Sequence, residues 1–186
     1  GENGAGKSTL LSLVCADNPQ SYACDIRLFG RRRGSGESIW EIKSHIGFTS
    51  SEMHLYYMEN VPCHSVVESG FFDSVGLYRH PSEGQSAYAM ELMKYLGIEH
   101  LAERGFLKVS SGEQRLVLFA RAIVKNPDLL ILDEPFHGVD YEHKMLCLGL
   151  IDQFLRQSEK SIIFVTHYRE EIPALVDRVK ELRISN

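Results

Sequence analysis

The sequence predicts an α/β fold in which a parallel β-sheet carries an inserted α-helical subdomain. Residues 129–132 and 161–166 form two continuous apolar runs, as expected of parallel strands that are covered on both faces. Residues 51–115 have a mainly helical pattern between the first strands and the return to β-structure. A glycine-rich loop at residues 1–9 leads directly into an apolar helix, which is typical of the start of such a core.

The first part of the chain alternates between helix and strand patterns. The first helix is expected to start at Lys7 and to end before residues 17–19, where Asp-Asn-Pro is a strong breaker. Residues 24–29 alternate enough to predict a strand, and residues 46–49 predict a short buried strand. Between these strands, the segment that starts at Ser38 resembles a capping box that opens a short helix.

The predicted helical subdomain covers residues 51–115, with helices near 66–72 and 83–96. The α/β core is then expected to consist of residues 1–50 and 116–186, so that the chain is a single domain with an insertion.

Residues 111–124 predict a helix that Asn-Pro terminates just before the first apolar run. A helix over residues 141–157 separates the two apolar runs, and a short helix and an edge strand near 178–182 follow them. Residues 31–36, with three arginines, are expected to form a polar loop. A solvated surface is favoured for them over a phosphate contact.

The glycine-rich loop is a candidate phosphate site because it fits the pattern G-x-x-x-x-G-K-[ST]. In this pattern backbone N–H groups cradle phosphates, Lys7 reaches the β- and γ-phosphates, and Ser8 holds Mg²⁺. It predicts a P-loop NTPase core, and since such a loop normally follows a buried strand, we expect N-terminal strands to be missing from this sequence. The candidate nucleotide-binding residues are Asn3, Gly4, Ala5, Gly6, Lys7, Ser8 and Thr9.

Carboxylates and a histidine follow the two apolar runs, at the strand ends where open α/β sheets bind ligands. Asp133 is a candidate Mg²⁺ ligand, and Glu134 is a candidate general base for an attacking water. His167 could contact a γ-phosphate and stabilise the charge that develops on it. A solvated strand end and a structural histidine are the alternative interpretations.

The segment before the helix at residues 111–124 is a second candidate anion site. Ser110 and Gly112 offer a hydroxyl and bare N–H groups at a helix N-terminus. Taken alone, this pattern indicates only an N-cap.

Composition narrows the classes of partner. The net charge of −5 opposes nucleic-acid binding, because phosphate contacts need a basic surface. No apolar run approaches the length of about 20 residues that spans a bilayer, so direct membrane insertion is not predicted. Four scattered cysteines indicate reduced thiols and a cytoplasmic location.

The order of these motifs resembles an ABC-type ATPase cassette over nearly the whole chain. Walker A, signature, Walker B, D-loop and H-loop would correspond to residues 1–9, 109–113, 131–135, 138–140 and His167. The resemblance implies ATP and Mg²⁺ as cofactors, with Glu134 as catalytic base and His167 as the γ-phosphate switch. It also implies that Ser110 and Gly112 act on nucleotide held by a second cassette, with Asp140 at the dimer contact.

Two positions depart from the family pattern. Ser50 and Ser51 stand where a glutamine that binds Mg²⁺ and couples to a permease is usual, so Ser51 is the candidate metal residue there, acting through water. Ser111 replaces the second glycine of the signature.

A narrower resemblance is to the second cassette of ModF-type ATP-binding proteins, which are assigned to molybdate transport or photorepair. It rests on residues 29–37, 46–55 and 70–78. It implies ATP hydrolysis between two cassettes of a tandem cytoplasmic protein, with a second cassette in the same chain or a homodimer as partner. A membrane permease would place the protein at the inner face of the membrane. The alternative is a soluble ATPase that acts on nucleic acid or the ribosome, and whether this chain is active by itself stays open.

Overall fold

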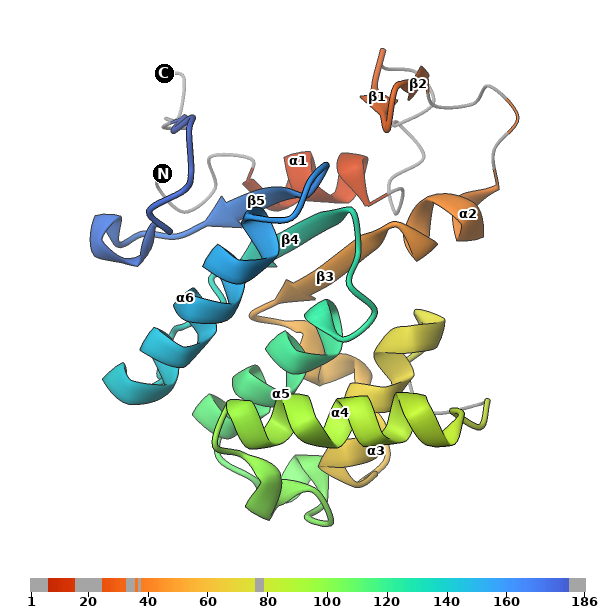
Figure 1. The fold of residues 1–186 in the computed structure, drawn as a ribbon, viewed down its shortest axis with the longest axis vertical. Helices are drawn as coiled ribbons and strands as arrows, with labels where there is room; N and C mark the ends of the chain where they lie inside the picture. The colour runs from red at the N-terminus through yellow and green to blue at the C-terminus, as the bar shows by residue number, and fades with distance from the viewer. Residues whose placement is uncertain (1–6, 16–24, 33–35, 37, 76–78, 181–186) are drawn as a thin grey trace.

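The computed structural model describes residues 7–15, 25–32, 36, 38–75 and 79–180. Its centre is a parallel sheet of three strands, in the order β3-β4-β5 (Figure 1). The strands are β3 (Ile46–Ser50), β4 (Leu129–Asp133) and β5 (Ser161–Val165). Both apolar runs and the short buried strand that the sequence predicts are therefore confirmed.

Helices cover both faces of this sheet, with α1 on one side and α5 and α6 on the other (Figure 1). The α-helices are α1 (Lys7–Val14), α2 (Ile39–Ser44), α3 (Cys63–Glu68), α4 (Glu83–Tyr95), α5 (Ser111–Ile123) and α6 (Tyr141–Leu155). The 3₁₀ turns are η2 (Met53–Tyr56), η3 (Ser69–Phe72), η4 (Glu99–Leu101), η5 (Phe106–Lys108) and η6 (Arg169–Glu171). No helix among the described residues is long and apolar enough to cross a membrane.

Strand β4 explains why its sequence is apolar at every position. Leu129 and Ile131 belong to the core cluster that α1 and α2 close, whereas Leu130 and Leu132 belong to the larger cluster on the opposite face. Because successive side chains of a strand point to opposite faces, a strand buried on both faces has no place for a polar residue.

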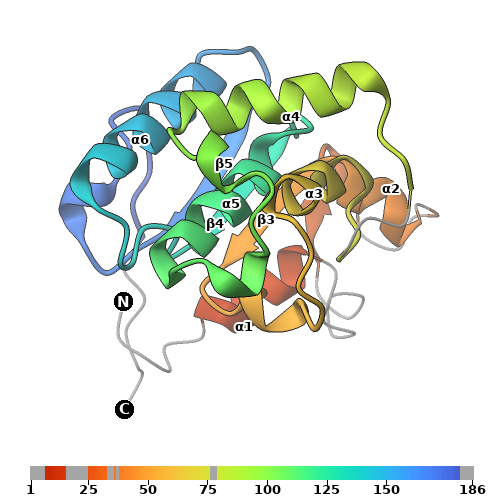
Figure 2. The same cartoon turned by 90° about the horizontal axis from the view of Figure 1, so that it is seen from below.

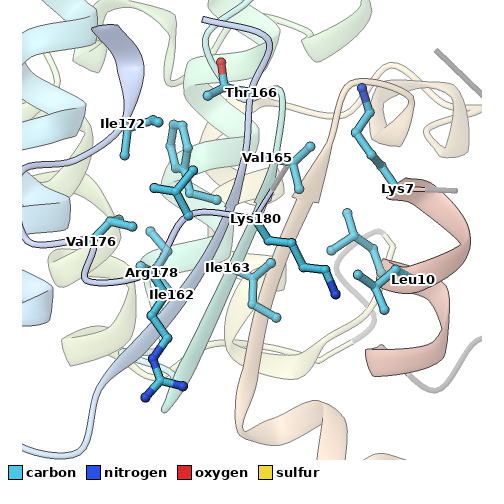
Figure 3. Close-up of a pocket in the computed structure, with 13 residues that line it drawn as sticks. Lys7, Leu10, Ile162, Ile163, Val165, Thr166, Ile172, Val176, Arg178 and Lys180 are labelled. Carbon is cyan, nitrogen blue, oxygen red and sulfur yellow. The ribbon is translucent and has the colours of Figure 1, made fainter. Parts of the chain in front are cut away.

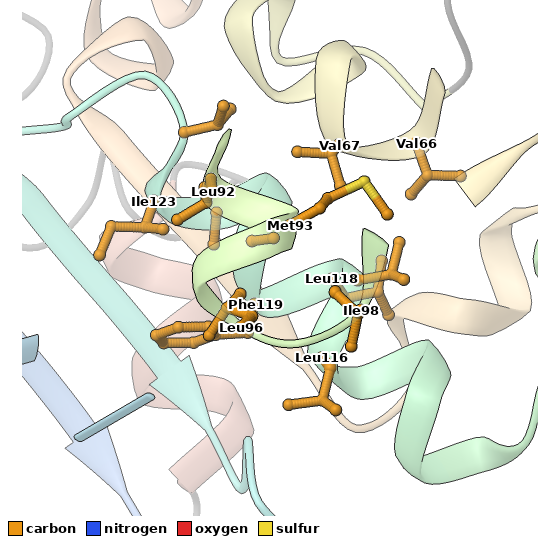
Figure 4. Close-up of a cluster of buried hydrophobic side chains, with 14 of the residues drawn as sticks. Val66, Val67, Leu92, Met93, Leu96, Ile98, Leu116, Leu118, Phe119 and Ile123 are labelled. Carbon is orange, nitrogen blue, oxygen red and sulfur yellow. The ribbon is translucent and has the colours of Figure 1, made fainter. Parts of the chain in front are cut away.

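The helical part between β3 and β4 packs α3, α4 and α5 against one another (Figure 2). Val67, Met93 and Phe119 meet in its interior with little or no exposure (Figure 4). A capping box at Ser82 starts α4. At Ser38, where the sequence predicts a capping box, the serine caps α2 by accepting from the N–H of Glu41. The helices α3, α4 and α5 confirm the helical pattern predicted between the first strands and the first apolar run.

Gly47 allows α5 to approach β3 closely. A Cβ atom at this position would lie 2.1 Å from the carbonyl oxygen of Ala122 in α5. Only glycine fits such a backbone contact, and the contact joins the helical part to the sheet.

The strand predicted at residues 24–29 is wrong in extent, and so is the loop predicted at 31–36. Within the described part of the predicted strand, only Arg27–Leu28 forms a strand, β1. It pairs antiparallel with β2 (Arg31–Arg32), at the start of the predicted loop, in a small hairpin. Phe29 and Gly30 both have positive φ, as a tight two-residue turn requires. The described part of the predicted strand, residues 25–29, therefore forms one arm and part of the turn of an exposed hairpin. Residues 24, 33–35 and 37 lie outside the described residues.

The short helix after β5 is η6, but the edge strand predicted near 178–182 is not present at residues 178–180. These three side chains are exposed, and although residues 178–180 line a groove together with β5, they form no ladder with that strand. An alternating run becomes a strand only when its backbone groups pair with those of a neighbouring strand. Residues 181–182 lie outside the described part of the chain.

Candidate functional site

Three of the predicted site residues meet although they come from distant parts of the sequence. Lys7 lies at the start of α1, Glu134 follows β4, and His167 follows β5. The Nζ atom of Lys7 lies 2.9 Å from Nε2 of His167 and 3.9 Å from Oε1 of Glu134. Nε2 of His167 in turn lies 2.7 Å from Oε1 of Glu134. The carboxyl ends of β4 and β5 thus bring a carboxylate and an imidazole together, and the start of α1 adds the ammonium group of Lys7.

The imidazole of His167 faces a donor and an acceptor through the same nitrogen atom. When Nε2 carries a proton it donates to Glu134, and when it is bare it accepts a hydrogen bond from Lys7. One nitrogen cannot do both at once, so the tautomer of the imidazole decides which of the two neighbours Nε2 holds.

Glu134, the residue directly after β4, has a backbone conformation that is unusual for a residue other than glycine. Its φ angle is 51°, in the left-handed region, and its N–H donates to the carbonyl of Val165 at 2.9 Å. This hydrogen bond extends the contact between β4 and β5 by one residue beyond the strands. A left-handed residue with a side chain costs free energy, and such positions are frequent at functional sites.

Asp133 is the last residue of β4 and continues the row of Leu129 and Ile131, on the sheet face that α1 covers. Burial raises the pKa of its carboxyl, and the neighbouring charge of Glu134 raises it further. Lys7 and His167 act in the opposite direction. The carboxylate is thus held where a cation would stabilise its charged form.

Ser51 lies directly beyond β3 and is half-buried; its carbonyl oxygen is within hydrogen-bonding distance, 2.9 Å, of Nδ1 of His54. In the sheet register Ser50, the last residue of β3, pairs with Asp133. Paired residues in a sheet present their side chains to the same face. Ser50 is therefore the better placed serine of the two.

The first part of the predicted phosphate loop, Asn3, Gly4, Ala5 and Gly6, lies outside the described residues. Ser8 and Thr9 belong to the first turn of α1, and the predicted start of this helix at Lys7 is confirmed.

Ser110 and Gly112 lie in a separate pocket of about 310 Å³, which Asp140 also lines. Ser110 is the N-cap of α5: its Oγ accepts from the N–H of Glu113, and its own N–H donates to Glu113 Oε2 at 2.7 Å. These bonds from Ser110 hold the pKa of the Glu113 carboxyl below its usual value. A Cβ atom on Gly112 would lie 2.5 Å from the carbonyl oxygen of Gly138.

A second groove, of about 290 Å³, runs along β5 to Lys7 (Figure 3). Ile163 and Val165 line it from the strand, and Leu10 lines it from α1. Among the described residues β5 pairs only with β4, so this groove follows the outer edge of β5.

Comparison with known proteins assigns the family. A family model described as ABC transporter matches residues 1–137. The chain belongs to the ABC transporter family. As an ABC cassette it is an ATPase domain, and ATP is the nucleotide that such cassettes bind.

Relatives of this ABC cassette include two proteins named for molybdate or as ModF. It is 48% identical over 177 residues to the ABC transporter ATP-binding protein ModF of Escherichia coli strain K12. This alignment covers 95% of the chain but 36% of ModF. It is 28% identical over 186 residues to the molybdate import ATP-binding protein MolC of Haemophilus influenzae, with 100% of the chain and 67% of MolC covered. The chain therefore spans about a third of the length of ModF.

A solved structure shows the same fold. It is described as the dimeric structure of a post-hydrolysis state of the ATP-binding cassette MJ0796 bound to ADP and Pi. The two chains share 22% identity and superpose with a TM-score of 0.70 over 91% of this chain and 73% of the other.

Two features of this ABC cassette are not evident from its sequence. Gly112 is in close backbone contact with Gly138, although these residues stand in different motifs. Glu171 is buried, with only 4% of its surface exposed, in the exposed-looking run Arg-Glu-Glu. A glycine and an acidic residue carry no sequence signal for such long-range contacts.

The arginines of the β1–β2 hairpin lie beside carboxylates in this ABC cassette. Nε of Arg32 is 3.3 Å from Oδ1 of Asp25, and Nη1 of Arg31 is 3.7 Å from Oε1 of Glu41. All four side chains are exposed. The geometry favours the interpretation of a solvated surface; Arg33 lies outside the described residues.

Proposed function

We propose that this chain supplies one half of an ATP-hydrolysing site, with Lys7, Glu134 and His167 as its reacting face. The observation that carries the proposal is the meeting of these three side chains, of which Lys7 and His167 are 160 residues apart in sequence. The same constellation occurs at the carboxyl edge of a parallel sheet, where ligands of α/β proteins bind.

Entry of a triphosphate would change the contacts of all three groups. The ammonium of Lys7 binds the β- and γ-phosphate oxygens, as the Walker A pattern implies. His167 then loses its Lys7 contact and turns its Nε2 proton toward the γ-phosphate. Glu134, released from His167, accepts a hydrogen bond from the attacking water and orients it.

Oxygen donors fit Mg²⁺ at this edge of the sheet. Asp133 offers a half-buried carboxylate with a raised pKa, and Ser50 and Ser51 offer hydroxyls at the end of β3. Such hard oxygen ligands suit Mg²⁺, which would neutralise phosphate charge when bound. We assign Asp133 and, from the Walker A pattern, Ser8 as its principal holders. Ser50, which pairs with Asp133, replaces the predicted Ser51 as the serine that would act through water.

The second half of the site is the pocket around Ser110, Gly112 and Asp140. This pocket shares no described lining residue with the pocket around Glu134 and His167. Its residues would act on nucleotide held by another cassette, either in the same polypeptide or in a second copy. The relative MJ0796, described as a dimer bound to ADP and Pi, supports such a pair.

The parent protein, by this proposal, is a tandem-cassette ATPase of the cytoplasm linked to molybdate transport, with a membrane permease as further partner. The name of the relative MolC, a molybdate import ATP-binding protein, supports the substrate class. Leu55 and Tyr56 in η2, and Met58 just beyond it, are exposed apolar side chains, which suit a protein partner. Activity on nucleic acid or the ribosome is less well supported, because Arg31 and Arg32 already lie beside carboxylates.

Two experiments test these assignments. In the complete protein, Glu134→Gln should retain ATP binding in an equilibrium titration while turnover falls by about 100-fold or more. Glu170→Gln, an exposed carboxylate on η6, is the matched control and should keep its turnover. Undiminished turnover of Glu134→Gln would remove Glu134 from the role of base. Stimulation of the ATPase by DNA or RNA, and not by permease-containing membranes, would overturn the transport assignment.

A further inference from the structure

Three side chains link the first turns of α6 to the segment that carries His167. The Oε1 atom of Glu171 accepts a hydrogen bond from Nζ of Lys144 at 2.7 Å, and its Oε2 atom accepts from Oγ1 of Thr166 at 2.6 Å. Lys144 lies on α6, and Thr166 directly precedes His167. We call Lys144, Glu171 and Thr166 the bridge.

The hydroxyl group of Thr166 is both a hydrogen-bond donor and a hydrogen-bond acceptor. It donates to Glu171, and it accepts a hydrogen bond from the backbone N–H of Tyr168 at 3.0 Å. The backbone on both sides of His167 is therefore fixed by one oxygen atom. Side-chain bonds of this local kind hold a turn in one conformation.

The carboxylate of Glu171 is buried far more than a surface ion pair requires. Its side chain is 5% exposed and that of Lys144 is 24% exposed. Removing a carboxylate from water is costly, and such a pair adds little stability compared with apolar packing. The better use of a buried, fully bonded carboxylate is to fix geometry, and here the geometry that it fixes is that of the residue before His167.

The far end of the bridge is anchored on a rigid element. The N–H of Lys144 donates to the carbonyl of Asp140 at 3.0 Å, so Lys144 belongs to the hydrogen-bonded first turns of α6. Asp140 caps this helix by accepting from the N–H of His143 at 3.1 Å. A support on a capped helix holds its partner within narrower limits than a support on a loop.

We propose that Thr166, Glu171 and Lys144 are positioning residues that hold His167 in place against Lys7 and Glu134. The proposal rests on the role assigned to His167 in the proposed function. Thr166 and Glu171 line the same pocket as Glu134 and His167. The role proposed for the bridge requires no contact with nucleotide, because the bridge acts by fixing the backbone from which the imidazole projects.

The test uses Thr166→Val in the complete protein, because valine keeps the shape of threonine but lacks its hydroxyl. We expect kcat to fall by about 10-fold or more, as for other supports of a reacting group, while the Kd for ATP changes by less than about 3-fold. The imidazole resonances of His167 in a histidine-labelled sample, assigned with His167→Asn, should shift. Thr166→Ser restores the hydroxyl and should restore both readouts.

A second pair of variants keeps the test decisive if Thr166→Val folds poorly. Lys144→Met breaks the bridge from its α6 end. The control, Lys160→Met, breaks the 3.2 Å contact between Nζ of Lys160 and Oδ1 of Asp128, which lies at the opposite end of β4. Lys144→Met should shift the His167 resonances and lower kcat, and Lys160→Met should change neither.

The proposal is overturned if Thr166→Val and Lys144→Met leave both kcat and the His167 resonances unchanged, or if Thr166→Ser loses as much as Thr166→Val. If the unmodified protein does not hydrolyse ATP, the proposed function fails, but the resonances still decide whether the bridge positions His167.

Discussion

Gly112 and Gly84 allow the contact between the signature segment and the D-loop to be measured. Each is the second residue of a helix, and each follows a serine capping box, at Ser110 and at Ser82. They differ in their surroundings: a Cβ atom at Gly112 would lie 2.5 Å from the carbonyl oxygen of Gly138, whereas nothing lies within 4 Å of a Cβ atom at Gly84. Replacing either glycine with alanine therefore raises helix propensity by a similar amount. Only the replacement at Gly112 also crowds a neighbouring backbone atom.

The expected magnitudes follow from this difference. Gly84→Ala should stabilise the fold by about 0.5–1 kcal/mol, because glycine is entropically unfavourable in a helix. At Gly112 the same gain is opposed, since the Gly138 carbonyl must move from 2.5 Å to at least 3.0 Å to admit the new methyl group. Such overpacking costs about 1–3 kcal/mol, which sets the expected difference between the two variants.

Chemical unfolding in urea measures both free energies of unfolding directly. In a thermal scan, a difference of about 1–3 kcal/mol corresponds to about 2–12 °C in Tm for a chain of this size. Equal stability of the two variants would refute the inferred contact. Gly112→Ala should also impair the pocket around Ser110 and Asp140, so ATP-dependent association of cassettes should weaken even where the variant remains folded.

Two further outcomes are expected. Burial and the charge of Glu134 raise the pKa of Asp133, so the folded state holds this proton more tightly than the unfolded state. Ionisation of Asp133 therefore lowers the free energy of unfolding. This loss is absent below the ordinary aspartate pKa of the unfolded chain, and it grows as pH rises through the raised pKa of the folded state. Asp133→Asn should thus be more stable than the unmodified protein at pH 7 and no more stable near pH 3, by urea unfolding; a stability gap that widens toward low pH would contradict this. Burial also raises the pKa of Cys63 to about 11 and that of Cys147 still further, so neither thiol should react with iodoacetamide at pH 8 in the native state, as mass spectrometry would show. Rapid labelling of either would place it nearer the surface than the structure does.

The elements whose signal is local could be predicted from the sequence. The apolar strand β4 and the capped helix α5 are encoded by neighbouring residues, and both were placed within one or two positions of their ends. The described parts of the segments at 24–29 and 178–182 were misjudged for the opposite reason. A short alternating run becomes a strand only if its backbone pairs with another strand, and that pairing depends on the rest of the fold.

The meeting of Lys7, Glu134 and His167 was predictable in kind, because parallel strands end at one edge and motifs mark those ends. The residues that support these three side chains could not be predicted from the sequence. Glu171 reads as one more exposed acidic residue, and only the fold shows that it is buried between Thr166 and α6. Sequence motifs thus identified the residues that we propose to react, whereas the residues proposed to hold them were found through burial and hydrogen bonds.

The contact between Gly112 and Gly138 changes what the signature segment means. A glycine in the first turn of a helix could be required by an anion alone, but Gly112 is also required by the close carbonyl of Gly138 in the same chain. Because this contact joins the signature segment to the loop that ends at Asp140, Ser110 and Asp140 line one pocket and not two independent surfaces. A second cassette that approaches Ser110 must therefore meet Asp140 as well, and any shift of Asp140 moves the cap of α6, on which Lys144 holds the bridge to His167. On this arrangement the surface offered to another cassette and the support of this chain's own imidazole share one helix.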